Sequence, residues 1–149
     1  MANYYIAFSF NIKLPKEATD YLIAVERAIS EWWNTDNEPD DPSLASDLIT
    51  ALTEVYPGGA DNALDITVER EGDEVAIYSE DGGNIEGTVA LLQHVMRKFD
   101  IPGIIAFGWA NYCDKPRTDA FGGGAVAISK TETRWLDTQK WIEEQETTE

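Results

Sequence analysis

The sequence predicts an α+β fold: one domain in which a mostly antiparallel sheet carries helices packed on one face. Apolar residues alternate with a period of two in several segments, and in others they recur every three or four residues. These patterns are typical of half-buried strands and of amphipathic helices. The 149-residue chain has no interior linker long enough to separate two domains. We therefore expect one domain over residues 1–149, with residues 143–149 as a frayed acidic tail, and the element order β-α-α-β-β-α-β-β-α.

The first strand and the first two helices are predicted from residues 4–55. Every second residue from Tyr4 to Leu14 is apolar, which indicates a strand with one buried face. Pro15 then opens a helix that continues to about Asn34, with this apolar stripe: Ala18, Leu22, Val25, Ile29 and Trp32. A second helix is expected from the N-cap Ser43, with a stripe made by Leu44, Leu48, Leu52 and Val55.

The second half of the chain predicts the remaining elements. Residues 64–81 form a hairpin that turns at Glu71-Gly72-Asp73. A third helix begins near Asn84 and ends at Pro102-Gly103, with the stripe Ile85, Val89, Leu92, Met96 and Phe99. The segment IIAFGWA is apolar on both alternations, which favours a central strand that is covered on both faces, or covered on one face and partly wrapped by the chain. AVAIS and TRWLD make a final strand pair or one bent strand, and Asp137 caps a short acidic helix that carries Trp141 and Ile142.

The charge of the chain is strongly acidic. Its 28 Asp and Glu exceed its 11 Lys and Arg and give a formal net charge of −17. Such a field repels nucleic acid and anionic membranes, so direct binding to nucleic acid or to a membrane is not expected. The same field speeds encounter with basic partners. The lone Cys cannot form an intrachain disulfide, and neither a signal pattern nor an apolar run of about 20 residues is present. We expect a cytoplasmic location.

The acidic residues fall into three clusters. The first occupies a loop and consists of Asp36, Glu38, Asp40 and Asp41. The second surrounds the hairpin and consists of Glu69, Glu71, Asp73, Glu74, Glu80 and Asp81. The third is the C-terminal tail, with Glu143, Glu144, Glu146 and Glu149. One interpretation is a solvated surface that confers solubility. The other is mimicry of a nucleic-acid backbone, since 17 charges correspond to roughly 8 base pairs of duplex. Mimicry requires that the acids share a face, and exposed Trp33 would serve as an aromatic anchor.

Residues 107–125 bring together aromatic, cationic and glycine residues. Lys115-Pro116-Arg117 follow the end of a strand and the three glycines precede the next, which predicts a connection of about a dozen residues, a length that is often functional. A small anionic-ligand site or an enzymatic site there would use Trp109, Cys113, Lys115, Arg117, Gly122, Gly123 and Gly124. The alternative is structural: the glycines permit close backbone approach or a bulge, and the two cations pair with nearby acids.

The same residues resemble a known group of proteins. The run Trp109-Ala110, Cys113, Lys115-Pro116-Arg117 and Phe121 to Ala125, with Trp135 downstream, is similar to a family of small uncharacterised proteins from phages, plasmids and bacteria. That family more often has Thr before the Cys and Ser after it, where this chain has Tyr112 and Asp114. The resemblance implies a mobile-element origin and transfers no catalytic residue.

Other site chemistry is weakly indicated. The acidic loop DNEPDD lacks the glycine and the distal glutamate of an EF-hand, and the single His94 and Cys113 have no partner that the sequence places, so we expect no metal and no cofactor. The leading hypothesis is a non-enzymatic acidic protein that inhibits a host nucleic-acid-binding defence complex by occupying its basic groove, as an anti-CRISPR protein or another DNA mimic does. The alternatives are the ligand or enzymatic site of residues 109–124 and a self-associating accessory domain, with Trp32 and Trp141 at the seam of a homodimer.

Overall fold

The computed structural model describes residues 4–35, 66–80, 82–116 and 121–146, with side chains in the first range described as far as Arg27. The elements in chain order are β1 (Tyr4–Ile12), α1 (Lys16–Thr35), β2 (Thr67–Glu71), β3 (Glu74–Ser79), α3 (Ile85–Lys98), β4 (Ile105–Cys113), β5 (Gly122–Ile128), β6 (Thr133–Asp137) and α4 (Thr138–Glu146). The predicted α+β class is confirmed. The second predicted helix, from Ser43 to Val55, lies outside the described residues.

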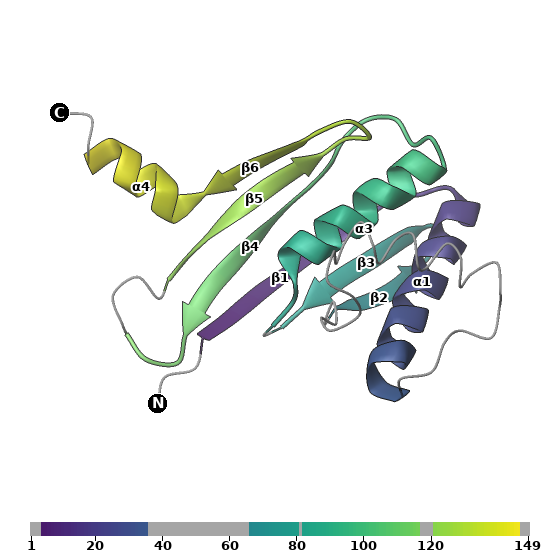
Figure 1. Ribbon diagram of the computed structural model, residues 1–149, viewed down its shortest axis with the longest axis horizontal. Helices are drawn as coiled ribbons and strands as arrows, with labels where there is room; N and C mark the ends of the chain where they lie inside the picture. Colours follow the sequence, from purple (N-terminus) through teal and green to yellow (C-terminus); the bar gives the residue numbers. More distant parts are fainter. Residues whose placement is uncertain (1–3, 36–65, 81, 117–120, 147–149) are drawn as a thin grey trace.

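The six described strands form one sheet in the order β2-β3-β1-β4-β5-β6, in which every neighbouring pair is antiparallel (Figure 1). Two local units, the hairpin β2–β3 and the meander β4–β5–β6, flank the N-terminal strand. β1 joins them by pairing with β3 on one side and with β4 on the other. The sheet therefore depends on pairings between strands that are far apart in the sequence.

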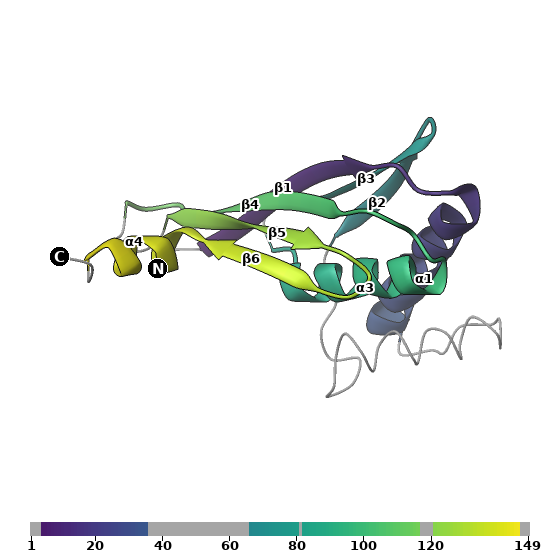
Figure 2. The same cartoon turned by 90° about the horizontal axis from the view of Figure 1, so that it is seen from above.

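The helices α1 and α3 lie on the same face of the sheet, as predicted, and α4 extends beyond the end of β6 (Figure 2). The core fills the space between this face and the two helices. Its fully buried members come from α1, α3 and the strands, and include Leu22, Val25, Ile77, Leu91, Leu92, Val95, Met96, Val126 and Ile128. The two apolar stripes are confirmed where side chains are described, whereas Ile29 and Trp32 of α1 lie outside that part.

Capping residues fix where the elements begin and end. The side chain of Asn84 accepts a 2.9 Å hydrogen bond from the amide of Gly87 at the start of α3, and Asp137 accepts one of 3.0 Å from the amide of Lys140 in α4. Gly72, at the hairpin turn, has a φ of 61°, which glycine adopts without strain. The predicted cap at Asp137 and the predicted turn are confirmed, and Asn84, predicted as the start of this helix, is its N-cap. The predicted N-cap Ser43 lies outside the described residues.

Several expectations need correction. α3 ends at Lys98 rather than at Pro102-Gly103, because Asp100 adopts a left-handed φ of 50° and Ile101 donates its amide to the carbonyl of Met96. β4 is central, but its burial alternates, so it is covered on one face only. The segment 143–149 was expected to be frayed, yet residues 143–146 belong to α4. For the final segments AVAIS and TRWLD, the predicted strand pair is confirmed: they lie in the paired strands β5 and β6.

Candidate functional site

The acidic side chains of the β2–β3 hairpin lie on the face of the sheet opposite α1 and α3, here called the open face. The register sets Glu69 opposite Ala76, and Glu71 opposite Glu74. The intervening residue Arg70 points to the helix face, where its guanidinium contacts Asp20 of α1 at 2.5 Å. Because side chains alternate along a strand, the three glutamates project together from the open face.

Glu71 and Glu74 form a cross-strand pair of like charges, an arrangement that destabilises a sheet. Asn11 of β1 donates a 3.2 Å hydrogen bond to Glu71. Tyr78 donates one of 3.1 Å to Glu69, and this bond raises the pKa of the tyrosine. Among the described residues, no Lys or Arg forms an ion pair with any of the three glutamates. The hairpin therefore exposes a local excess of negative charge.

Asp73 differs from the other hairpin acids. It lies at the turn and pairs with Lys13 at 3.0 Å, with both side chains largely exposed. The hydrogen bond and the charge of Lys13 lower the pKa of Asp73, and Asp73 in turn raises the pKa of Lys13. Asp73 is thus already matched by a cation, and the acidic site reduces to Glu69, Glu71 and Glu74, which we call the hairpin acids.

The remainder of the open face extends over β1, β4, β5 and β6. The register of β1, β4 and β5 brings small residues together at its centre: Ala7, Ala106, Gly108, Ala110, Ala125 and Ala127. Tyr5 and Tyr112 stack beside them with ring centroids 4.9 Å apart. Sequence reasoning missed this face because it followed only the even-numbered positions of residues 4–14. The odd-numbered positions, such as Tyr5 and Ala7, are the ones whose side chains form this face.

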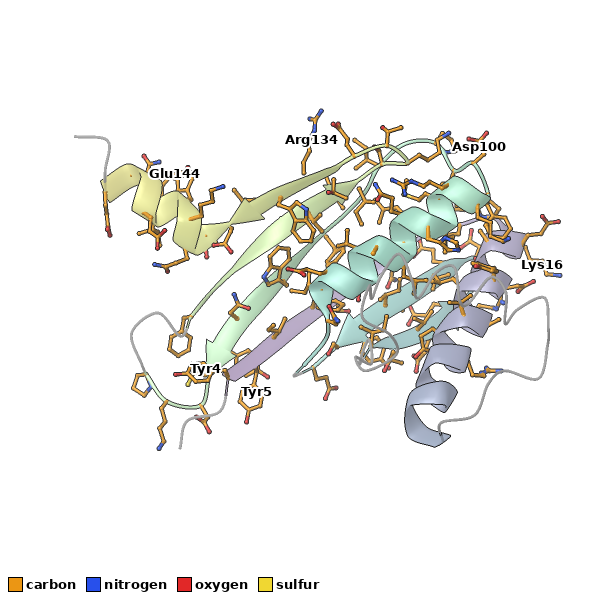
Figure 3. The ribbon with its side chains drawn as sticks, viewed as in Figure 1. Tyr4, Tyr5, Lys16, Asp100, Arg134 and Glu144 are labelled. Atoms are coloured by element: carbon orange, nitrogen blue, oxygen red, sulfur yellow. The ribbon has the colours of Figure 1, made fainter. Side chains whose placement is uncertain are left out.

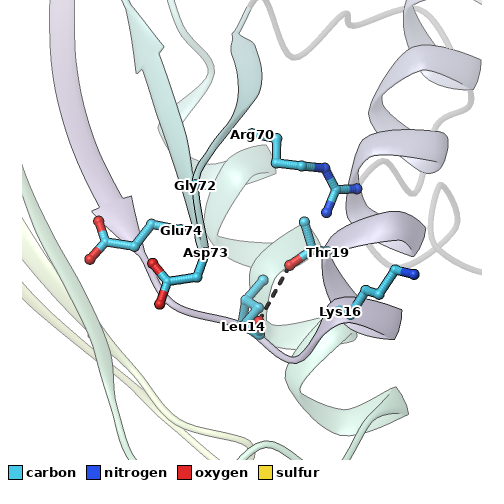
Figure 4. A pocket seen from close by; sticks show the side chains of 7 residues that line it. All are labelled: Leu14, Lys16, Thr19, Arg70, Gly72, Asp73 and Glu74. Carbon is cyan, nitrogen blue, oxygen red and sulfur yellow. Dashed lines mark hydrogen bonds between the residues drawn. The ribbon is translucent and has the colours of Figure 1, made fainter.

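A cavity of about 280 Å³ lies beside the hairpin turn, between the turn and the start of α1 (Figure 4). Its charged lining residues are Lys16, Arg70, Asp73 and Glu74. Arg70 and Lys16 extend on the α1 side, whereas Asp73 and Glu74 lie on the other side of the hairpin. Because two cations and two carboxylates line the cavity, it favours neither an anionic nor a cationic ligand.

The remaining predicted partner-binding residues lie outside the described part of the chain. Asp36, Glu38, Asp40 and Asp41 belong to residues 36–65, and the side chain of Trp33 is not described. Acids of the third cluster are in α4, at the opposite end of the long axis from the hairpin turn (Figure 1). The described acids therefore do not gather on a single face.

The triple glycine is part of strand β5 rather than of the loop before it. Gly122, Gly123 and Gly124 pair with Asn111, Ala110 and Trp109 of β4. A Cβ atom on Gly123 would lie 2.2 Å from the carbonyl oxygen of Trp109, and one on Gly124 would lie 2.3 Å from that of Leu136. The glycines thus permit close backbone approach, which is the structural alternative stated above.

Of the other members of the alternative ligand site, Trp109 lies opposite Gly124 in the register. Trp109 packs against the core, with its ring 6.0 Å from that of Trp135, while Cys113 is buried and donates weakly to Asp114. Lys115 is exposed, and Arg117 lies outside the described residues. His94 forms a 2.8 Å hydrogen bond with Tyr21, where α3 faces α1.

Metal-binding clusters and membrane-spanning helices are both absent from the described residues. These residues contain no group of three or more His, Cys, Asp or Glu side chains placed to hold a metal ion. No helix within the described ranges is long and apolar enough to cross a bilayer. Comparison of the chain with protein-family models, with curated proteins and with solved structures finds no match.

Proposed function

We propose that this chain is a non-enzymatic binding protein whose hairpin acids occupy a basic, nucleic-acid-binding groove on a partner protein. The observation that carries the proposal is the opposition of Glu71 and Glu74 beside Glu69 on an uncovered sheet face. This arrangement costs folding stability, and a basic partner would relieve the repulsion on binding. The family resemblance makes a bacterial defence complex, such as a CRISPR effector, the first partner class to test.

The charge of the whole chain supports the same proposal. A net charge of −17 accelerates encounter with a basic groove and opposes binding to nucleic acid itself. The small side chains at the centre of the open face would let the surface of a partner approach the sheet closely beside the hairpin acids. Because the α4 acids lie at the other end of the molecule, the proposal rests on the hairpin acids and not on the total charge.

The test compares two doubly substituted proteins with equal charge changes. Glu69→Lys with Glu74→Lys reverses two hairpin acids, and Glu17→Lys with Glu86→Lys reverses two exposed acids on α1 and α3. The tagged wild type and both tagged variants are used to capture partners from a bacterial lysate, followed by elution with salt and competition with a 20-base-pair duplex.

We expect the wild type and the helix variant to retain a nucleic-acid-binding complex that both salt and duplex displace. The hairpin variant should lose it and should be at least as stable as the wild type, because the lysine introduced at position 74 would face Glu71 in place of a carboxylate. Equal capture by the two variants, or capture that duplex does not compete, would refute the proposal.

A further inference from the structure

The sheet ends at strand β6, whose outer side pairs with no described strand. The amide of Ser129 donates to the carbonyl of Glu132 at 2.9 Å, so these two residues form a hydrogen-bonded pair at the β5–β6 turn. Hydrogen-bonded and non-hydrogen-bonded pairs alternate along an antiparallel ladder. The backbone groups of Thr133, Trp135 and Asp137 therefore point outward, ready to accept a further strand.

Large apolar side chains are exposed along this edge and on the helix that follows it. The exposed fractions are 49% for Trp135, 54% for Leu136, 55% for Trp141 and 43% for Ile142. No residue of α4 is buried. In both views α4 continues away from the sheet in the direction of β6 (Figures 1 and 2). An open edge strand with exposed aromatic residues is a template for pairing with another chain.

Charges at the two ends of β6 indicate what covers it. At the β5–β6 turn, Arg97 donates to the carbonyl of Lys130, Lys130 pairs with Asp100, and Arg134 pairs with Glu132. This end carries three cations against two acids. The other end continues into α4, which carries Lys140 against Glu143, Glu144 and Glu146. Arg134 and Glu144 mark these opposite ends in Figure 3.

We propose that the β6 edge binds a second copy of this chain, with the two β6 strands antiparallel about a two-fold axis at Trp135. This places Trp135 opposite its counterpart, Thr133 opposite Asp137 of the second copy, and Leu136 opposite Arg134 of the second copy. Residues with outward backbone groups thus face one another, as a ladder requires. A register centred on Arg134 would oppose two arginines, and one centred on Leu136 would set Trp135 against the carboxylate of Asp137.

The antiparallel arrangement also matches the charges. The acidic α4 of each copy, about 13 Å long, would begin opposite Glu132 and continue past the β5–β6 turn of the other copy, where Arg97, Lys130 and Arg134 lie. This local attraction offsets part of the repulsion between two chains that each carry −17. Self-pairing would join two sheets into one and place the hairpin acids at its two outer ends.

Sedimentation velocity across a range of concentrations tests the proposal. The wild type should shift from 16.6 kDa to twice that mass as concentration rises. Leu136→Lys opposes Arg134 of the second copy and should raise the dimer dissociation constant by at least about tenfold. Tyr4→Lys also replaces an exposed apolar residue, at a strand end far from β6, and should leave the constant unchanged.

A rescue and a cross-link test the register. Arg134→Glu combined with Leu136→Lys restores opposite charges across the axis and should restore the dimer. Trp135→Cys should form an intermolecular disulfide under mild oxidation, because hydrogen-bonded pairs have Cα atoms about 5.5 Å apart. Thr133→Cys, which faces Asp137, should not. A wild type that stays monomeric at millimolar concentration, or a dimer indifferent to Leu136→Lys, would overturn the proposal.

Discussion

Glu26 shows how a single side chain in this fold can oppose stability. It is a half-buried carboxylate on α1, and burial raises its pKa, while the neighbouring Arg27 acts in the opposite direction. Burial disfavours the charged form, so the native state holds the Glu26 proton to a higher pH than the unfolded state does. The residue therefore penalises folding at neutral pH and not at low pH.

Glu26→Gln should stabilise the protein at pH 7 and lose this effect at low pH. In the wild type, the stability that comes from protonated Glu26 is fully present below the ordinary glutamate pKa of about 4.3. It is lost as the pH rises through the raised pKa of Glu26 in the native state. Because the group is partly exposed, the gain at pH 7 should stay below about 1 kcal/mol, or about 4 °C in Tm. Thermal unfolding of both proteins from pH 3.5 to 7.5 measures it; a gain that persists unchanged at pH 3.5 would contradict this cause.

At the scale of the elements, the strands β4, β5 and β6 depend on glycines for their spacing. A Cβ atom on Gly124 would lie 2.4 Å from the Trp109 ring in addition to its contact with the carbonyl of Leu136. Neither neighbour is the flexible end of a side chain that could move aside. Gly108 lies on β4, opposite Ala125 of β5, and has more space around it. A Cβ atom on Gly108 would lie 3.2 Å from its nearest neighbour, the carbonyl oxygen of Gly124.

Gly124→Ala should therefore destabilise the protein by about 1–3 kcal/mol, since extra atoms in a filled space force the backbone apart. Gly108→Ala, on the open face among alanines, is the matched control and should cost distinctly less. Urea unfolding followed by circular dichroism gives both values. Equal costs would show that close approach of the strands at Gly124 is not what requires a glycine there.

At the scale of the whole molecule, charge opposes the compact state. A formal charge of −17 on a chain of this size produces self-repulsion that the core must overcome. The described ion pairs Lys13–Asp73, Arg70–Asp20, Lys130–Asp100 and Arg134–Glu132 are at the surface, where such pairs contribute little.

Raising the ionic strength from 0.01 M to 0.15 M should therefore raise Tm by several degrees. The screening length falls from about 30 Å to about 8 Å, which weakens repulsion between distant carboxylates more than it weakens the short ion pairs. Differential scanning calorimetry at constant pH and at low protein concentration measures the change. Sodium and potassium chloride should act equally; a Tm that is unchanged or lower in salt would show that self-repulsion does not limit stability.

The candidate site could be predicted only in part. The sequence places Glu69, Glu71 and Glu74 around a hairpin. That Glu71 pairs with Glu74 depends on the register of β2 and β3, which the structure supplies. The triple glycine was expected in a loop, because the sequence does not reveal that β4 and β6 both approach it. The edge formed by Trp135 and Leu136 was not foreseen, since a strand becomes an edge only when the order of the sheet is known.

Local sequence patterns by themselves determined the α+β class, the described helices, the hairpin turn at Gly72 and the cap at Asp137, because each depends on interactions within a few residues. Only the tertiary structure decided that β1 pairs with β3 and β4, that β4 is covered on one face, and that β6 lies at an edge. Those outcomes depend on contacts between distant segments, where the burial of apolar surface selects one strand order among many that share the same local pattern.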